Sequence, residues 1–171
     1  MKMLNLAATS GSLVLLAASV AYAASLTNAD KQFLITAARD DMTQAHEGQM
    51  AESQAARADV KSFAKTLVDD HTADYTQVSQ LAAKVGVTVP TGINTSRNAT
   101  IEQLGRLKGD RFDHQFTNDE IASHRQLLAA YQHEAKDGHD ADVKAYAQKA
   151  IPVLEKHLQL AQQCAKPMGH S

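Results

Sequence analysis

The feature that most constrains the fold of this chain is a series of four long segments in which apolar residues recur at helical spacing. The segments run from about Asn28 to Arg57, Asp59 to Val85, Asp110 to Lys136 and Asp140 to Ala165. This spacing places one apolar stripe on each helix, and the stripe must be buried against other helices. With 8 Gly and 3 Pro in 171 residues, turn formers are too few for an all-β sandwich or barrel. We therefore predict an all-α protein.

The connections between the four segments predict how the helices are arranged. The connection after Arg57 and the turn at 137–139 are short, whereas the link from Gly86 to Asn98 is long and irregular. A short extra helix is expected from about Ala99 to Lys108, after this link. Two short connections and one long one are typical of a four-helix bundle made of two antiparallel hairpins joined by a crossover.

An internal repeat supports the two hairpins. The sequence VKSFA at 60–64 resembles VKAYA at 143–147, which lies 83 positions further on. Phe33 and Phe112 stand in matching places 79 positions apart.

The hairpin turns also predict which residues lie at the same level of the bundle. His71 is expected at the level of Gln44, and His157 is expected to face Glu120.

The first residues have the pattern of an export signal. Met1 to Ala23 carries one basic residue, Lys2, then an apolar run, then the Ala21-Tyr22-Ala23 cleavage pattern. The apolar run is about 12 residues long, short of the roughly 20 that span a bilayer. We predict cleavage after Ala23, a helical bundle over 24–165, a flexible tail over 166–171, and a location in the periplasm or cell envelope.

Composition excludes several classes of function. The chain has 17 Lys+Arg against 19 Asp+Glu, a formal net charge of -2, so we expect no nucleic-acid partner. One cysteine excludes an internal disulfide framework and a cysteine-based zinc site. The sequence contains no Gly-x-Ser-x-Gly elbow, phosphate loop or dinucleotide fingerprint. After the signal, no segment is apolar and long enough to cross a membrane.

Polar residues occupy several positions that the periodicity assigns to the buried faces of the helices. A polar residue at such a position says more about function than an apolar residue does. His71 continues the apolar stripe of the second segment, and His157 continues that of the fourth. Glu120 and His124 share one face of the third segment. Carboxylates and imidazoles that project inward from several helices form the metal sites of bundles, and Zn, Fe, Cu and Mn accept this mixture. The candidate ligands for a divalent transition-metal ion are Asp41, His71, Asp74, Glu120, His124 and His157.

Two other interpretations stay open. A buried layer of histidine and carboxylate can serve only to fix helix register, and the protein is then a structural or stress-related interaction module without a core ligand. The third interpretation is a di-metal redox enzyme, but its paired Glu-x-x-His signature is missing, since Val68 precedes His71 by three residues. No catalytic residue is assigned, and we expect a protein that is not an enzyme.

The C-terminal region leaves the assembly of the protein open. Cys164 can pair between chains in an oxidising compartment, it can join Met168 and His170 in holding a soft ion, or the tail can be frayed and inert. A homo-oligomer and an envelope protein are both candidate partners.

Several short segments together carry a resemblance to a known family. They are VKSFA at 60–64, VDDHT at 68–72, LAAKVGV at 81–87, FD at 112–113, and IPVL at 151–154 followed by His157. The chain resembles, from about Asp30 to Gln162, a family of exported bacterial ferritin-like domains of unknown function, often labelled predicted outer membrane proteins. The resemblance implies a ferritin-like four-helix bundle, an envelope location and no established activity. The family usually has an acidic residue where this chain has Gln44.

Overall fold

The computed structural model describes residues 26–93 and 95–166, and all regular elements within these two ranges are helices. The elements are α1 (Asn28–Gln54), α2 (Ala58–Lys84), the 3-10 helix η1 (Thr95–Arg97), α3 (Asn98–Gly105), α4 (Asp110–Asp137) and α5 (Ala141–Cys164). The all-α prediction is confirmed. The predicted signal segment 1–23 and, apart from Lys166, the predicted tail 166–171 lie outside the described residues.

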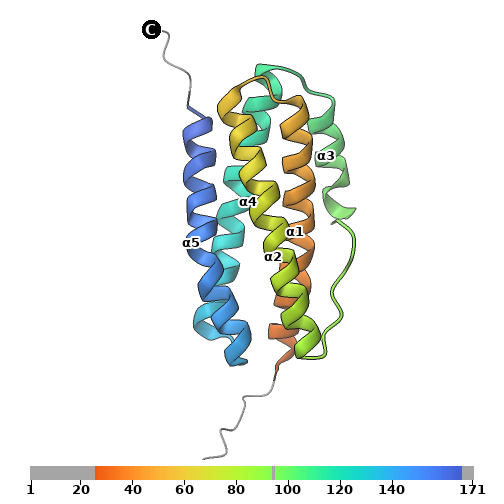
Figure 1. The fold of residues 1–171 in the computed structure, drawn as a ribbon, viewed down its shortest axis with the longest axis vertical. Coiled ribbons are helices and arrows are strands. Elements are labelled where there is room, and N and C mark those ends of the chain that lie inside the picture. Colours follow the sequence, from red (N-terminus) through yellow and green to blue (C-terminus); the bar gives the residue numbers. More distant parts are fainter. Residues whose placement is uncertain (1–25, 94, 167–171) are drawn as a thin grey trace, which may run out of the picture.

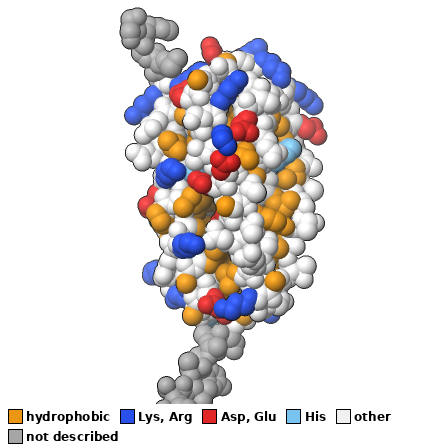
Figure 2. Space-filling model, viewed as in Figure 1, with side chains coloured by type: hydrophobic (Ala, Val, Ile, Leu, Met, Phe, Trp, Pro, Cys, Tyr) orange, Lys and Arg blue, Asp and Glu red, His pale blue; other side chains and the backbone are white. Residues whose placement is uncertain are grey.

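The long helices form two antiparallel hairpins, α1 with α2 and α4 with α5, which pack side by side (Figure 1). The crossover from α2 to α4 runs along the outside of the first hairpin and carries η1 and α3. The predicted bundle of two hairpins with a short extra helix in the crossover is thus confirmed. None of the helices in the described ranges has a stretch apolar enough to cross a bilayer. On the face shown in Figure 2, charges of both signs are interspersed.

Local sequence explains where the helices begin and end. Thr27 caps α1, because its hydroxyl accepts the Asp30 backbone N–H at 3.2 Å and the Asp30 carboxylate accepts the Thr27 N–H at 2.7 Å. α2 ends just before Gly86, whose φ of +75° favours glycine. α1 ends at Gln54 and not at the predicted Arg57. The first hairpin is therefore centred near Ala56, earlier than predicted.

Two apolar clusters fill the two ends of the bundle, and buried polar residues separate them. The first cluster includes Ala38, Val78, Leu127 and Leu154, and the second includes Ala51, Leu67, Phe116 and Ala161. On each long helix, buried polar residues fall between a member of one cluster and a member of the other. We call this cross-section the polar layer, and it contains Asp41, Gln44, Glu47, His71, Glu120, Ser123, His124 and His157. All four long helices contribute to it.

α1 and α2 come close together next to the polar layer. A Cβ atom at Gly48 would lie 2.9 Å from Cγ2 of Val68 and 3.0 Å from the carbonyl oxygen of Ala64. These distances are too short for a side chain, so glycine permits the close approach of the two helices. The approach holds α1 against the helix that carries His71.

Each hairpin turn is capped by an aspartate from the other hairpin. Asp113 of α4 accepts the backbone N–H groups of Ala56 and Arg57 at 3.0 and 2.8 Å. Asp30 of α1 accepts the backbone N–H of His139 at 2.9 Å. These reciprocal caps join the two hairpins at both ends of the bundle.

The caps also define the internal repeat. Asp30 and Asp113 are 83 positions apart, as are the segments 60–64 and 143–147. At this offset Phe33 corresponds to Phe116, which lies one helical turn from the predicted match, Phe112.

The carboxyl pair Asp30 and Glu134 predicts a stability that depends on pH. Burial, followed by the hydrogen bond with Asp30, raises the pKa of Glu134 to about 7 from its ordinary 4.5. Burial would raise the pKa of Asp30 as well, but hydrogen bonds from His139 and Thr27 lower it to about 2. When the pKa of a carboxyl group is higher in the folded protein than in the unfolded chain, the group stabilises the fold at a pH below its pKa in the unfolded chain. This contribution is lost as the pH rises through the pKa of the group in the folded protein.

We therefore expect Glu134→Gln to remove this loss, because glutamine stays neutral at every pH. At pH 8 the variant should exceed the wild type in free energy of unfolding by roughly 1–3 kcal/mol, and at pH 4.5 the two should be nearly equal. Urea denaturation of both proteins at the two pH values measures the difference. A difference that is the same at both pH values would contradict the assignment.

Candidate metal centre

Three histidines from three helices converge in the polar layer. His71 comes from α2, His124 from α4 and His157 from α5, with 3%, 0% and 1% of their surfaces exposed. One ring nitrogen of each lies within 4.8 Å of the corresponding nitrogens of the other two. The ring centroids are 5.2 to 5.7 Å apart. We call these three residues the histidine triad.

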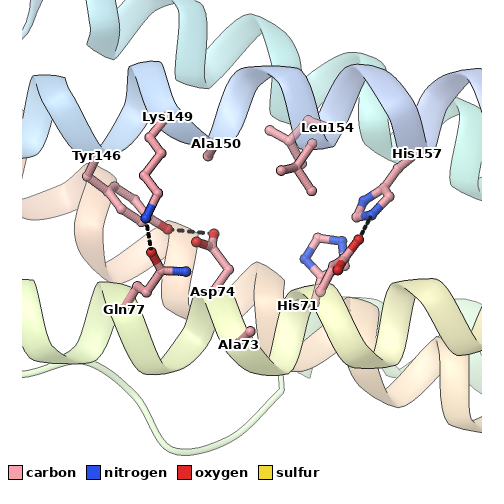
Figure 3. A pocket seen from close by; sticks show the side chains of 11 residues that line it. His71, Ala73, Asp74, Gln77, Tyr146, Lys149, Ala150, Leu154 and His157 are labelled. Carbon is pink, nitrogen blue, oxygen red and sulfur yellow. Dashed lines mark hydrogen bonds and ion pairs between the residues drawn. The ribbon is translucent and has the colours of Figure 1, made fainter.

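Two rings of the histidine triad are held by aspartates on neighbouring helices. Nδ1 of His71 lies 2.9 Å from Oδ1 of Asp41 on α1. Nε2 of His157 lies 2.9 Å from Oδ2 of Asp70 on α2. The contact between His157 and Asp70 crosses from one hairpin to the other (Figure 3). Both contacts fix the orientation of the rings.

The third ring is held by its own helix. Nδ1 of His124 lies 2.9 Å from the carbonyl oxygen of Glu120 and 3.3 Å from a carboxylate oxygen of the same residue. The Gln44 amide fixes that carboxylate, since its nitrogen lies 3.0 and 3.1 Å from the two Glu120 oxygens while its oxygen accepts the Ser123 hydroxyl at 2.7 Å. Every ring of the triad thus has one nitrogen next to an oxygen atom of a neighbouring helix or of its own helix.

The hydrogen bonds assign the protons of the histidine triad. A ring nitrogen that faces an oxygen acceptor carries the proton, so the other nitrogen of a neutral ring carries a lone pair. The lone pairs then belong to Nε2 of His71, Nε2 of His124 and Nδ1 of His157. The last two atoms are 3.3 Å apart, and Nε2 of His71 is buried with no hydrogen-bond partner in the described part of the chain. Three convergent nitrogen lone pairs form the donor set of a metal site.

The electrostatics of the layer keep the rings of His71 and His157 neutral. Burial, followed by the charges of the other two rings, lowers the pKa of His71 well below its usual value. Burial lowers the pKa of His157 to about 4, although the hydrogen bond to Asp70 opposes this shift. Burial and the charge of Asp74 raise the pKa of Asp41 well above its ordinary value. Neutral imidazoles are the form in which histidine binds metals.

The structure separates the six predicted ligands into three groups. His71, His124 and His157 face one another. Asp41 and Glu120 contact the outward nitrogens of two of these rings. Asp74 lies one turn beyond His71 and accepts the hydroxyl of Tyr146 at 2.8 Å.

The predicted register differs from the structure by about one turn. His71 contacts Asp41 and not Gln44, and His157 contacts His124 and not Glu120. In the first hairpin the cause is the early end of α1, which moves the centre of the turn.

Sequence reasoning missed the roles of four polar residues in this region. Asp70 directly precedes His71 in the sequence, and nothing in the helical periodicity indicates that it holds His157. Glu47 is 2% exposed and follows Gln44 by three positions on the same face of α1, a spacing that could have revealed it. Arg97 and Ser123 hydrogen-bond to each other, but Arg97 comes from the irregular crossover, where no periodicity predicts which way a side chain points.

A cleft between α2 and α5 leads from solvent to His71 and His157 (Figure 3). Its volume is about 150 Å³, and His71, His157, Asp70 and Asp74 lie along it. Tyr146 reaches across the cleft to Asp74 at its other end. His71 and His157 therefore have a path to the surface that passes the charged side chains of Asp70, Asp74 and Lys149.

Comparison with known proteins identifies the family and the fold. A family model described as "Domain of unknown function (DUF4142)" matches residues 15–164, so the chain belongs to this family. No curated protein matches the chain. The predicted resemblance to a ferritin-like domain of unknown function is confirmed.

Three solved structures share the fold at low sequence identity. A DUF305 fragment from Deinococcus radiodurans has a TM-score of 0.72 at 13% identity, over 82% of this chain and 97% of its own. CopM in the Cu(II)-bound form has a TM-score of 0.68 at 13% identity, over 80% and 95%. A dodecameric thioferritin, the bacterioferritin-related protein from Bacteroides fragilis, has a TM-score of 0.63 at 16% identity, over 82% and 86%.

Proposed function

We propose that this member of the DUF4142 family binds one divalent transition-metal ion through His71, His124 and His157, and that it acts as a metal-binding protein and not as an enzyme. One observation carries the proposal: each ring has one nitrogen fixed by an oxygen acceptor, so the three remaining lone pairs point toward a common centre. Histidines that bind metals almost always donate their other N–H to a carboxylate or carbonyl group in this way.

The spacing of the donor atoms supports a metal ion. Two nitrogens bound to one tetrahedral ion at about 2.0–2.1 Å lie about 3.3 Å apart. Nε2 of His124 and Nδ1 of His157 are 3.3 Å apart. The triad as a whole spans up to 4.8 Å, so we expect one ring to move inward when the ion binds.

The donor set favours copper or zinc. Three imidazole nitrogens without a thiolate suit both ions, and a nitrogen site generally holds Cu²⁺ more tightly than Zn²⁺. The carboxylates of Asp70 and Glu120 behind the rings add the negative charge that a divalent ion requires. The solved structure of CopM, a bundle with the same fold, is of its Cu(II)-bound form, and this supports copper for the present chain.

We also propose that the protein works in the periplasm or cell envelope. The support for this location is the signal-like segment 1–23, with its apolar run and its Ala21-Tyr22-Ala23 pattern. A metal-binding bundle in that compartment would meet incoming ions through the cleft between α2 and α5.

Metal titration of the tag-free chain tests the proposal. We expect one equivalent of Cu²⁺ or Zn²⁺ per chain to remain bound after gel filtration, and the melting temperature to rise with ion concentration. The triple variant His71→Leu/His124→Leu/His157→Leu should retain none. The matched control is His46→Ala/His133→Ala, because both of these histidines are exposed. Retention of the ion by the triple variant, or its loss from the control, would refute the assignment.

A further inference from the structure

A second group of buried charges lies on the α1–α4 side of the polar layer. Nη2 of Arg97 contacts both carboxylate oxygens of Glu47, at 2.8 and 2.9 Å, and Nε contacts one of them at 3.1 Å. Nη1 of Arg97 donates to the Ser123 hydroxyl oxygen at 3.1 Å. Glu47 is 2% exposed, so its carboxylate depends on this guanidinium for its neutralising charge.

This group is continuous with the histidine triad. The Ser123 hydroxyl donates to Gln44, and the Gln44 amide contacts both oxygens of Glu120. Glu120 in turn holds His124. Burial and the charge of Glu120 raise the pKa of Glu47, and the charge and hydrogen bonds of Arg97 oppose this shift. Arg97 is therefore the cation that faces Glu47, and Ser123 and Gln44 connect it to Glu120.

We infer that Arg97 fills, as an internal cation, a second cation position beside the histidine triad, and that it thereby limits the bundle to one metal ion. This inference rests on the proposed function for the first ion, but it concerns different residues and a different class of ion.

The chemistry of the second position follows from its oxygen atoms. Without the guanidinium, the Glu47 carboxylate and the Ser123 hydroxyl, which both contact it, would form an all-oxygen set together with the Gln44 amide oxygen, which accepts from that hydroxyl. Such a set suits hard cations such as Mn²⁺ and not copper. A groove of about 400 Å³, lined by Gln44, Arg97 and Ser123 among others, connects this position to solvent. Arginine cannot lose its proton in a protein, so the guanidinium of Arg97 stays charged at every physiological pH.

The variant Arg97→Met tests this inference, with Mn²⁺ as the probe. The wild type should bind no Mn²⁺ at concentrations up to about 1 mM, whereas Arg97→Met should bind one equivalent and gain thermal stability from it. The matched control is Glu47→Gln/Arg97→Met, which removes both charges of the ion pair and should bind no Mn²⁺. Equilibrium dialysis gives the stoichiometry, and circular dichroism gives the stability.

Every outcome of the Arg97→Met experiment either supports or overturns the inference. If Arg97→Met loses its helical signal without metal, Mn²⁺ should restore it, and failure to restore it would overturn the inference. The inference is also overturned if Arg97→Met folds but binds no Mn²⁺. It is likewise overturned if the double variant binds as much Mn²⁺ as Arg97→Met. Binding of Cu²⁺ or Zn²⁺ by the wild type is measured separately. If only the proposal for the histidine triad is wrong, Arg97→Met will bind Mn²⁺ while the wild type binds neither Cu²⁺ nor Zn²⁺.

Discussion

His157→Leu is expected to lower the affinity for Zn²⁺ about 100-fold without destabilising the metal-free protein. Structural zinc sites with four ligands bind with about 10–16 kcal/mol, so each ligand supplies about 3 kcal/mol, which corresponds to a factor of about 100 or more. The fold should tolerate leucine here because replacing a buried polar group by an apolar one of similar size is often neutral or stabilising. Its partner Asp70 has a side chain 37% exposed, so this carboxylate stays hydrated when the imidazole is removed.

A matched change behind the ligand should have a smaller effect. Asp70→Asn keeps a hydrogen-bond acceptor for His157 but removes its charge, and loss of such a supporting group typically costs a factor of about 10 to 100. Isothermal titration of the wild type and both variants gives the order. Equal affinities for all three proteins would show that His157 is not a ligand, and a larger loss in Asp70→Asn than in His157→Leu would show that the carboxylate binds the ion directly.

Asp113→Ala is expected to be the most destabilising substitution outside the polar layer, at about 2–4 kcal/mol. Asp113 is 2% exposed and accepts two backbone N–H groups of the α1–α2 turn, from Ala56 and Arg57. Each hydrogen bond to a charged group contributes about 1.5–3 kcal/mol, partly offset by the water that reaches the turn in the variant. The melting temperature should fall by about 5–15 °C.

Two further variants separate the cap from general effects of charge. Asp113→Asn retains one acceptor oxygen and should lose about half as much stability as Asp113→Ala. Asp59→Ala, which removes a side chain 46% exposed near the same turn, should lose less than about 1 kcal/mol. Chemical denaturation of all three proteins provides the measurement. If Asp113→Ala is no less stable than Asp59→Ala, the aspartate does not cap the turn.

The helices and their pairing could be predicted because they depend on local patterns. Apolar stripes at helical spacing define the long helices, and Thr27 and Gly86 mark two of their boundaries. Short and long connections then select the two hairpins. The inward positions of His71, His124 and His157 follow from the same stripes, since each continues an apolar face.

The residues that hold the rings of the histidine triad could not be predicted in the same way, because their roles depend on contacts between helices. A shift in the end of α1 changes the partner of His71 from Gln44 to Asp41, and no local pattern fixes such a boundary to within a turn. Asp70 sits on the edge of α2, where only the position of α5 shows that it meets His157. Arg97 belongs to an irregular connection, whose path is set by packing on the finished bundle.

X-ray absorption spectroscopy of the protein loaded with one equivalent of Cu²⁺ or Zn²⁺ identifies the ligands of the bound ion. Three imidazole nitrogens are expected at about 2.0–2.1 Å from the ion, with the multiple-scattering features of histidine rings. His157→Leu should reduce the number of imidazoles to two. A spectrum with one imidazole or none, dominated by oxygen donors, would contradict the histidine triad as the binding site.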